Sequence, residues 1–242
     1  MSDIYYNTPC ELYRGFLESD KKMRECLENI LNFAIVKAYE KYKDSGKELT
    51  TIAKKYCGVN VGSESNQKRV LREGKKLIGD YETYIANTPA YFCIKHDMFW
   101  LFRDNESTVE ERAVLLANLA LRSMIGKRDI MRTNTVFLLS RMAGNTKAVP
   151  LAKIPDCIVR YGERYQREKL QRLLYERHGI TFYAGTKWHT MRGFYFSTKL
   201  TVEELIKRVE ADRQAAAAKP KDPLKEARRA ALEKLKIWPD SG

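Results

Sequence analysis

The sequence predicts a mainly α-helical protein with a minor β component. Three observations favour this class: several long segments repeat apolar residues every three or four positions, helix-capping residues precede them, and segments of alternating polarity are few and short. The chain has 242 residues, of which 44% are hydrophobic, so it can bury a substantial core. No apolar run approaches the roughly 18 residues that a membrane-spanning helix needs.

The N-terminal residues lack the basic stretch and apolar run of a signal peptide, so we expect a cytoplasmic protein without a membrane partner. Five cysteines are too few, and odd in number, to predict a disulfide framework.

The N-terminal part of the chain predicts two helices. Residues 9–19 indicate a short helix, and residues from Asp20 to about Lys43 indicate a long one. The long segment carries one apolar stripe, formed by Met23, Leu27, Ile30, Leu31, Ala34, Ile35 and Ala38. Gly46 follows in a position that favours a left-handed helix end.

Residues 47–79 resemble a helix-turn-helix, with a small first helix, a turn at Gly58 and a basic second helix. The turn through Gly62 is longer than usual, and Gly74 weakens the second helix. Two packed helices joined by a loop are the alternative.

Residues 80–103 are rich in aromatic side chains. Ala90–Ile94 and Met98–Arg103 suggest a β-hairpin that turns at Lys95-His96-Asp97. A buried helix after Pro89 is the alternative, because periodicity does not distinguish the two in short apolar runs.

Two further helices follow. Ser107 and Glu110 have the spacing of a capping box, which predicts a helix that ends at Gly126. Thr133 or Asn134 is expected to cap the next helix, which stops at Gly144. Residues 145–161 predict a loop with a short strand at Cys157–Tyr161.

The order of elements in 163–197 suggests a winged helix. A basic helix at about 163–177 precedes two strands, Ile180–Ala184 and Arg192–Ser197, which flank a basic loop. With the two preceding helices, this order suggests a winged-helix-like central region whose helix enters the major groove and whose hairpin touches the DNA backbone. A helix packed on a small sheet without a ligand is the alternative.

The C-terminal part predicts a helical arm. Thr201 and Glu204 form a second candidate capping box, for a helix that ends near Arg213. Residues 214–223 have the composition of a linker, and Pro223 begins a last amphipathic helix. The predicted organisation is therefore a helical region at 1–79, a basic winged-helix-like domain at 80–213, and a linker with a helix at 214–242.

The positive charge is concentrated in one stretch. The chain has a net charge of +13, and residues 127–199 alone hold 15 basic and 5 acidic side chains. Such clustering predicts a polyanionic partner, because each cation that neutralises a phosphate releases counterions. Ion pairs along a solvated helix are the alternative, and Arg164, Glu168 and Arg172 have the required spacing.

The predicted nucleic-acid contacts lie on three segments. The basic helix contributes Arg164, Arg167, Lys169, Arg172 and Arg177. The loop of the hairpin contributes Lys187, Trp188 and Arg192, of which Trp188 could stack on a base. The turn after Gly126 contributes Lys127 and Arg128.

Catalytic signals are weak. The chain has three histidines, and Cys93-x-x-His96 lacks a second ligand pair at zinc-finger distance, so no metal site is predicted. Nucleotide-binding, hydrolase and zinc-protease motifs are absent from the sequence, so neither a cofactor nor a catalytic residue is predicted.

These observations predict a non-enzymatic nucleic-acid-binding protein, with double-stranded DNA favoured over RNA, acting in regulation or replication. The alternative is a scaffold component of a virion or ribonucleoprotein, whose C-terminal helix joins neighbouring subunits. An enzyme without a recognisable motif, such as a nuclease, is a third reading.

Overall fold

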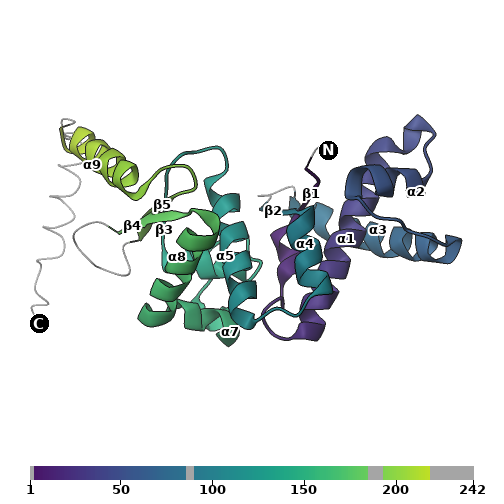
Figure 1. Ribbon diagram of the computed structural model, residues 1–242, viewed down its shortest axis with the longest axis horizontal. Helices are drawn as coiled ribbons and strands as arrows, with labels where there is room; N and C mark the ends of the chain where they lie inside the picture. Colours follow the sequence, from purple (N-terminus) through teal and green to yellow (C-terminus); the bar gives the residue numbers. More distant parts are fainter. Residues whose placement is uncertain (1–2, 86–89, 185–192, 219–242) are drawn as a thin grey trace, which may run out of the picture.

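A computed structural model describes residues 3–85, 90–184 and 193–218 (Figure 1). The described chain is mainly helical with two small antiparallel sheets, so the predicted class is confirmed. Its helices fall into two groups that lie side by side, one before and one after the connection at Asn105–Thr108 (Figure 1). No helix within these ranges is long and apolar enough to cross a membrane.

The first group contains one small sheet and four helices. Its elements are β1 (Tyr5–Pro9), α1 (Asp20–Tyr42), α2 (Leu49–Ile52), α3 (Glu64–Ile85), β2 (Tyr91–Lys95) and α4 (His96–Asp104). The long helix predicted from Asp20 is confirmed, and the Ser19 hydroxyl caps it by accepting from the Lys22 amide. The short helix predicted at 9–19 is wrong apart from one 3-10 turn at Cys10–Tyr13, because β1 extends through Pro9 and pairs with β2.

The aromatic segment after β2 differs from the predicted hairpin. The strand predicted at Ala90–Ile94 is confirmed as β2, but it pairs with β1. The residues expected to form its partner strand, Met98–Arg103, belong to the helix α4. Phe99 and Phe102 are buried at helical spacing, while Leu101 between them is exposed. The helical alternative is therefore confirmed only from His96 onward, because the residues before it form β2, which pairs with the distant strand β1.

α3 packs across α1, and Gly74 lies at the crossing. A Cβ atom at Gly74 would lie 2.6 Å from the Asn32 carbonyl oxygen and would also collide with the Val36 side chain. Glycine lowers the helix propensity of α3 at this position, but its lack of a side chain allows the backbones of α1 and α3 to approach each other. The Asn32 side chain donates to the Glu73 carboxylate across the same contact (2.9 Å).

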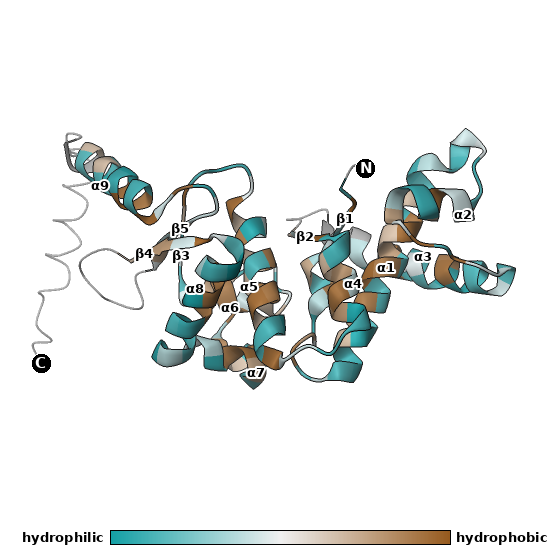
Figure 2. Cartoon of the chain, viewed as in Figure 1, coloured by the Kyte–Doolittle hydropathy of each residue, from teal (hydrophilic) through white to brown (hydrophobic). Residues whose placement is uncertain are grey.

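The second group contains the other sheet and five helices. Its elements are α5 (Val109–Ile125), β3 (Met131–Thr133), α6 (Thr135–Met142), α7 (Asp156–Val159), α8 (Arg164–His178), β4 (Thr181–Tyr183), β5 (Phe194–Ser197) and α9 (Val202–Ala218). Apolar residues of α5, α6 and α7 gather inside this group, whereas α8 and α9 carry mostly hydrophilic residues on their outer sides (Figure 2).

The helix caps largely follow the sequence. Asn134 caps α6, and Thr201 forms the predicted capping box with Glu204. The box of α5 lies one residue later than predicted, at Thr108 and Glu111, because the Ser107 hydroxyl instead accepts from the Arg112 guanidinium.

Two other expectations of the sequence need correction, and one strand was not expected. Cys157–Tyr161 is not a strand: Pro155 is the N-cap of α7, and a 3-10 turn follows this helix. The strand β3 was not predicted. Residues 214–218 belong to α9, so the predicted linker is wrong there, and the last helix expected from Pro223 lies outside the described residues.

The three-stranded sheet has the order β3-β5-β4, and both pairs are antiparallel. Phe194 and Phe196 of β5 point into the core, and Tyr195 between them points to the opposite face. α9 contacts β4 and β5, and its Leu205 and Val209 are buried.

α5 connects the two groups. Residues 112–121 of this helix are all buried, and α5 contacts β2, α6 and α8. The Arg112 guanidinium is buried, donates to the Ser107 carbonyl oxygen (2.7 Å) and pairs with Asp20 at the start of α1. This cation therefore links α1, the connection between the groups, and α5.

The crossing of α1 and α3 yields a matched pair of substitutions. We expect Gly74→Ala to lower the free energy of unfolding by about 1–3 kcal/mol, because the new methyl group overpacks the contact with α1. A Cβ at Gly79, on the same helix, meets nothing within 4 Å. Gly79→Ala should therefore raise that free energy by about 0.4–1 kcal/mol, through helix propensity and the unfolded chain. Urea denaturation measures the free energy of unfolding of both variants. Similar changes in the two variants would contradict the close contact between α1 and α3 at Gly74.

Candidate nucleic-acid interface

α8 is held by one narrow apolar side and a defined end. Leu170 and Leu174 are buried, and the helix contacts α5 through this side. Gly179 ends the helix with a φ of +64°, and the amide of Ile180 donates to the Leu174 carbonyl oxygen (3.3 Å). Because β4 begins directly after this turn, α8 is fixed to the edge of the sheet.

The outer side of α8 is a row of exposed charged and aromatic residues. The Arg164 side chain is 84% exposed, and Tyr165 and Tyr175 are 73% and 54% exposed. Arg164 pairs with Glu168 (Nε–Oε1 3.0 Å), and Arg172 with Glu176 (3.8 Å). Ion pairs along a solvated helix were the alternative to a polyanionic partner, and such pairs are present on this face.

Two other basic residues of α8 pair with acids outside the stretch 127–199. Lys169 Nζ lies 2.6 Å from Glu110, and Arg177 lies 3.7 Å from Glu111, both in the first turn of α5. The hydrogen bond to Glu110 raises the pKa of Lys169. The count of charges within 127–199 omits these two acids, so the local excess of positive charge around α8 is smaller than that count indicates.

Arg167 has a local role. It is partly buried and donates to the Gly162 carbonyl oxygen (3.4 Å), which stabilises the turn that precedes α8. It is thus less accessible than Arg164 and Arg172.

The pair Lys127 and Arg128 lies at the end of α5, beside the sheet. Arg128 donates to the carbonyl oxygens of Met124 (2.8 Å) and Ile125 (3.3 Å), so its guanidinium caps the helix. Lys199 approaches from the residues after β5, contacts the Lys127 carbonyl oxygen and pairs with Asp129 (2.7 Å). That ion pair lowers the pKa of Asp129.

Lys187, Trp188 and Arg192 lie outside the described residues. Their positions relative to α8 therefore stay predictions.

The structure adds a cluster that sequence reasoning missed. We call it the arginine–tyrosine cluster: Arg132, Tyr183, Tyr195 and Arg213. The sheet register aligns Arg132 with Tyr195 and Tyr195 with Tyr183. The Cζ atom of Arg213 lies 5.4 Å from the ring centre of Tyr195 and 5.8 Å from that of Tyr183, and Arg132 lies 5.8 Å from Tyr195. The alternating Phe194-Tyr195-Phe196 pattern was visible in the sequence, but the two arginines come from β3 and α9.

An acid also reaches this cluster. The Tyr183 hydroxyl donates to Glu210 of α9 (2.9 Å), and this bond raises the pKa of Tyr183. The cluster therefore offers two guanidinium groups and two ring faces beside one carboxylate.

The described residues bring together no group of three or more His, Cys, Asp or Glu side chains that could hold a metal ion. Near the sequence pair Cys93 and His96, the imidazole Nδ1 lies 2.8 Å from the Tyr6 hydroxyl and accepts from Trp100 Nε1 (3.3 Å). Burial raises the pKa of Cys10, Cys26 and Cys57 to about 12, which disfavours a thiolate nucleophile at these positions.

Comparison of the chain with protein-family models, with curated proteins and with solved structures gave no match. Its function is therefore proposed from the geometry of its own residues.

The last residue of α8 gives a test of the electrostatics. Burial lowers the pKa of His178 below its usual value, and the positive charges of Arg122 and Arg177 lower it further. We expect Arg122→Gln to raise this pKa, measured by NMR titration of the imidazole, and Arg164→Gln at the far end of α8 to leave it unchanged. An unchanged pKa in Arg122→Gln would contradict this cause.

The same shift makes stability depend on pH. Because the pKa is lowered in the folded protein, the unfolded imidazole binds a proton first as the pH falls through its ordinary value of about 6.5. The contribution of His178 to stability is therefore complete above that pH and is lost as the pH falls through the folded pKa. Urea denaturation should show a flatter pH dependence in His178→Gln.

Proposed function

We propose that residues 109–197 form a winged-helix-like unit that binds double-stranded DNA through α8, without catalysis. The observation that carries this proposal is the order of elements, α5-β3-α6-α8-β4-β5, together with the strand order β3-β5-β4. In a winged helix, two helices with a short strand between them precede the recognition helix. A hairpin then follows, and its last strand pairs with the first strand of the sheet.

One departure from a compact winged helix is the connection between α6 and α8. It includes α7 and two 3-10 turns, Leu151–Lys153 and Arg160–Gly162, and both α7 and the second turn contact α6. The second turn also contacts α8, which keeps its contacts with α5 and β4. The side of α8 opposite Leu170 and Leu174 remains exposed.

The exposed face of α8 suits a DNA groove in both size and chemistry. A helix of 15 residues is about 22 Å long, and the major groove admits one helix. Arg164 and Arg172 can contact phosphates or guanine edges, and Glu168 and Glu176 can accept from cytosine amino groups. Tyr165 and Tyr175 add exposed rings to the same row.

Two further basic surfaces lie on or beside the three-stranded sheet. The arginine–tyrosine cluster includes the last residue of β4, Tyr183, and its partner Tyr195 on β5. In the sequence, Lys187, Trp188 and Arg192 fall between these two tyrosines. Lys127 and Arg128 precede β3 and Lys199 follows β5, so these three cations lie at the other end of the β3–β5 pair. We propose that these cations contact the DNA backbone next to the groove that α8 enters.

The first test measures DNA affinity by fluorescence anisotropy at several salt concentrations. We expect Arg164→Ala with Arg172→Ala to weaken binding to double-stranded DNA by about tenfold or more and to reduce the salt slope by about 2. The matched control is Lys68→Ala with Arg72→Ala, which removes two exposed cations from α3.

Equal loss of affinity in the two double variants would remove α8 from the interface. Weak binding to double-stranded DNA, single-stranded DNA and RNA, even at low salt, would overturn the proposal. The basic surface would then be an interface for an acidic protein, as in a scaffold.

A second test uses the acid that pairs with Lys169. Glu110→Gln removes this partner, so the ammonium becomes available to a phosphate. We expect DNA affinity to rise by about two- to fivefold, the range that a surface ion pair allows. Glu64→Gln is the matched control, because Glu64 pairs with Lys68 at the same 2.6 Å distance on α3. A similar rise in the control would indicate an effect of net charge alone.

A further inference from the structure

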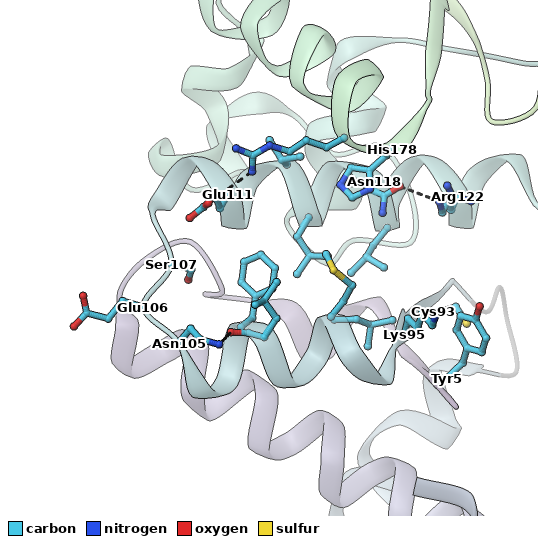
Figure 3. Close-up of a pocket in the computed structure, with 18 residues that line it drawn as sticks. Tyr5, Cys93, Lys95, Asn105, Glu106, Ser107, Glu111, Asn118, Arg122 and His178 are labelled. Carbon is cyan, nitrogen blue, oxygen red and sulfur yellow. Dashed lines mark hydrogen bonds and ion pairs between the residues drawn. The ribbon is translucent and has the colours of Figure 1, made fainter. Parts of the chain in front are cut away.

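A groove of about 650 Å³ lies between the two groups of helices and is not used by the proposed function. α4 and β2 form one side, and α5 with the C-terminal end of α8 forms the other (Figure 3). Its volume is in the range of small-molecule sites, which favour the boundary between structural units.

The middle of the groove is apolar on both sides. Six apolar side chains from α4 and α5 line it: Met98, Leu101, Phe102, Val114, Leu115 and Leu119. Leu101 is 52% exposed although it lies in a concave surface. An exposed leucine at this place gains from contact with an apolar ligand, because the contact removes it from water.

One end of the groove carries positive charge. Arg122 and Asn118 of α5 and His178 of α8 lie on one side of this end, across from Lys95 (Figure 3). The Arg122 guanidinium donates to the Asn118 side-chain oxygen (2.9 Å), and no acidic side chain of the described residues forms an ion pair with it. Lys95 pairs with Asp3 (3.2 Å) and Arg177 with Glu111 (3.7 Å). Among the lysines and arginines described along the groove, Arg122 is therefore the cation that remains for a ligand.

The opposite end carries Glu106 and Glu111 (Figure 3). Glu111 is occupied, because its carboxylate accepts from the Thr108 amide and hydroxyl and pairs with Arg177. The groove therefore has an acidic end, an apolar middle and an end with an available arginine.

We propose that this groove binds a small organic anion whose carboxylate or sulfonate pairs with Arg122 and whose apolar body lies on Leu101 and its neighbours. The volume fits a ligand of one or two rings rather than a peptide helix or a nucleic acid strand. The positively charged end of the groove selects an anion. A cationic ligand would be repelled by Arg122, and a neutral ligand would leave the guanidinium without a counter-charge.

The test uses 8-anilinonaphthalene-1-sulfonate, an aromatic anion whose fluorescence rises in an apolar site. We expect saturable binding to one site. Leu101→Glu and Arg122→Gln should each weaken that binding by about tenfold, the first by loss of apolar contact and added repulsion, the second by loss of the ion pair. The matched controls are Leu151→Glu, at a leucine that is 44% exposed outside the groove, and Arg208→Gln on α9.

A second readout locates the probe by its protection of a thiol in the groove. Cys93 is exposed and lines the groove, whereas Cys10, Cys26 and Cys57 are buried. Bound probe should slow alkylation of Cys93 by N-ethylmaleimide, and Cys93→Ser identifies the reacting thiol. Circular dichroism establishes that each variant is folded.

Binding that is not saturable, that is equal in the groove variants and the controls, or that leaves Cys93 alkylation unchanged would overturn the proposal. None of these measurements involves DNA. A failure of the groove proposal and a failure of DNA binding are therefore distinguishable.

Discussion

The burial of α5 is the constraint on which the rest of the structure depends. Ten consecutive residues of this helix, 112–121, are buried, including Arg112. A helix buried around its whole circumference needs partners on every side, and here β2, α6 and α8 supply them. The Arg112 guanidinium adds a polar link to α1 that would be costly to leave unpaired, because a buried cation without a partner is strongly destabilising. The two groups of helices thus share one central element.

The position of α8 follows from this constraint. Leu170 and Leu174 bury one side of the helix, and Lys169 and Arg177 reach the first turn of α5, where Glu110 and Glu111 lie. These contacts turn Arg164, Tyr165 and Arg172 outward. The same helix pair forms one wall of the groove between the groups, so a single packing arrangement sets both the outer row of α8 and the groove.

The sequence predicted the elements that are determined by residues close together in the chain. The apolar stripe from Met23, the cap of α6 at Asn134 and the capping box of Thr201 with Glu204 each depend on neighbouring residues. The strands β1 and β3 were missed because each exists only through a distant partner. The α4 segment was predicted as a strand because its apolar run is too short for periodicity to decide. Of the candidate site, the basic row of α8 was visible in the sequence, but Arg213 beside Tyr195 depends on tertiary contacts.

Ion pairs change the meaning of the charge count. Fifteen basic residues against five acids in 127–199 suggested unpaired cations, yet Lys169 and Arg177 pair with carboxylates that precede this stretch. These pairs are partly exposed, and exposed pairs contribute little to stability. A phosphate can therefore replace Glu110 at Lys169 at low cost, whereas a weak or single anion gains little from the exchange. The acids of α5 and α8 would then favour a dense polyanion over isolated anions, since only a row of phosphates can engage several of these cations together.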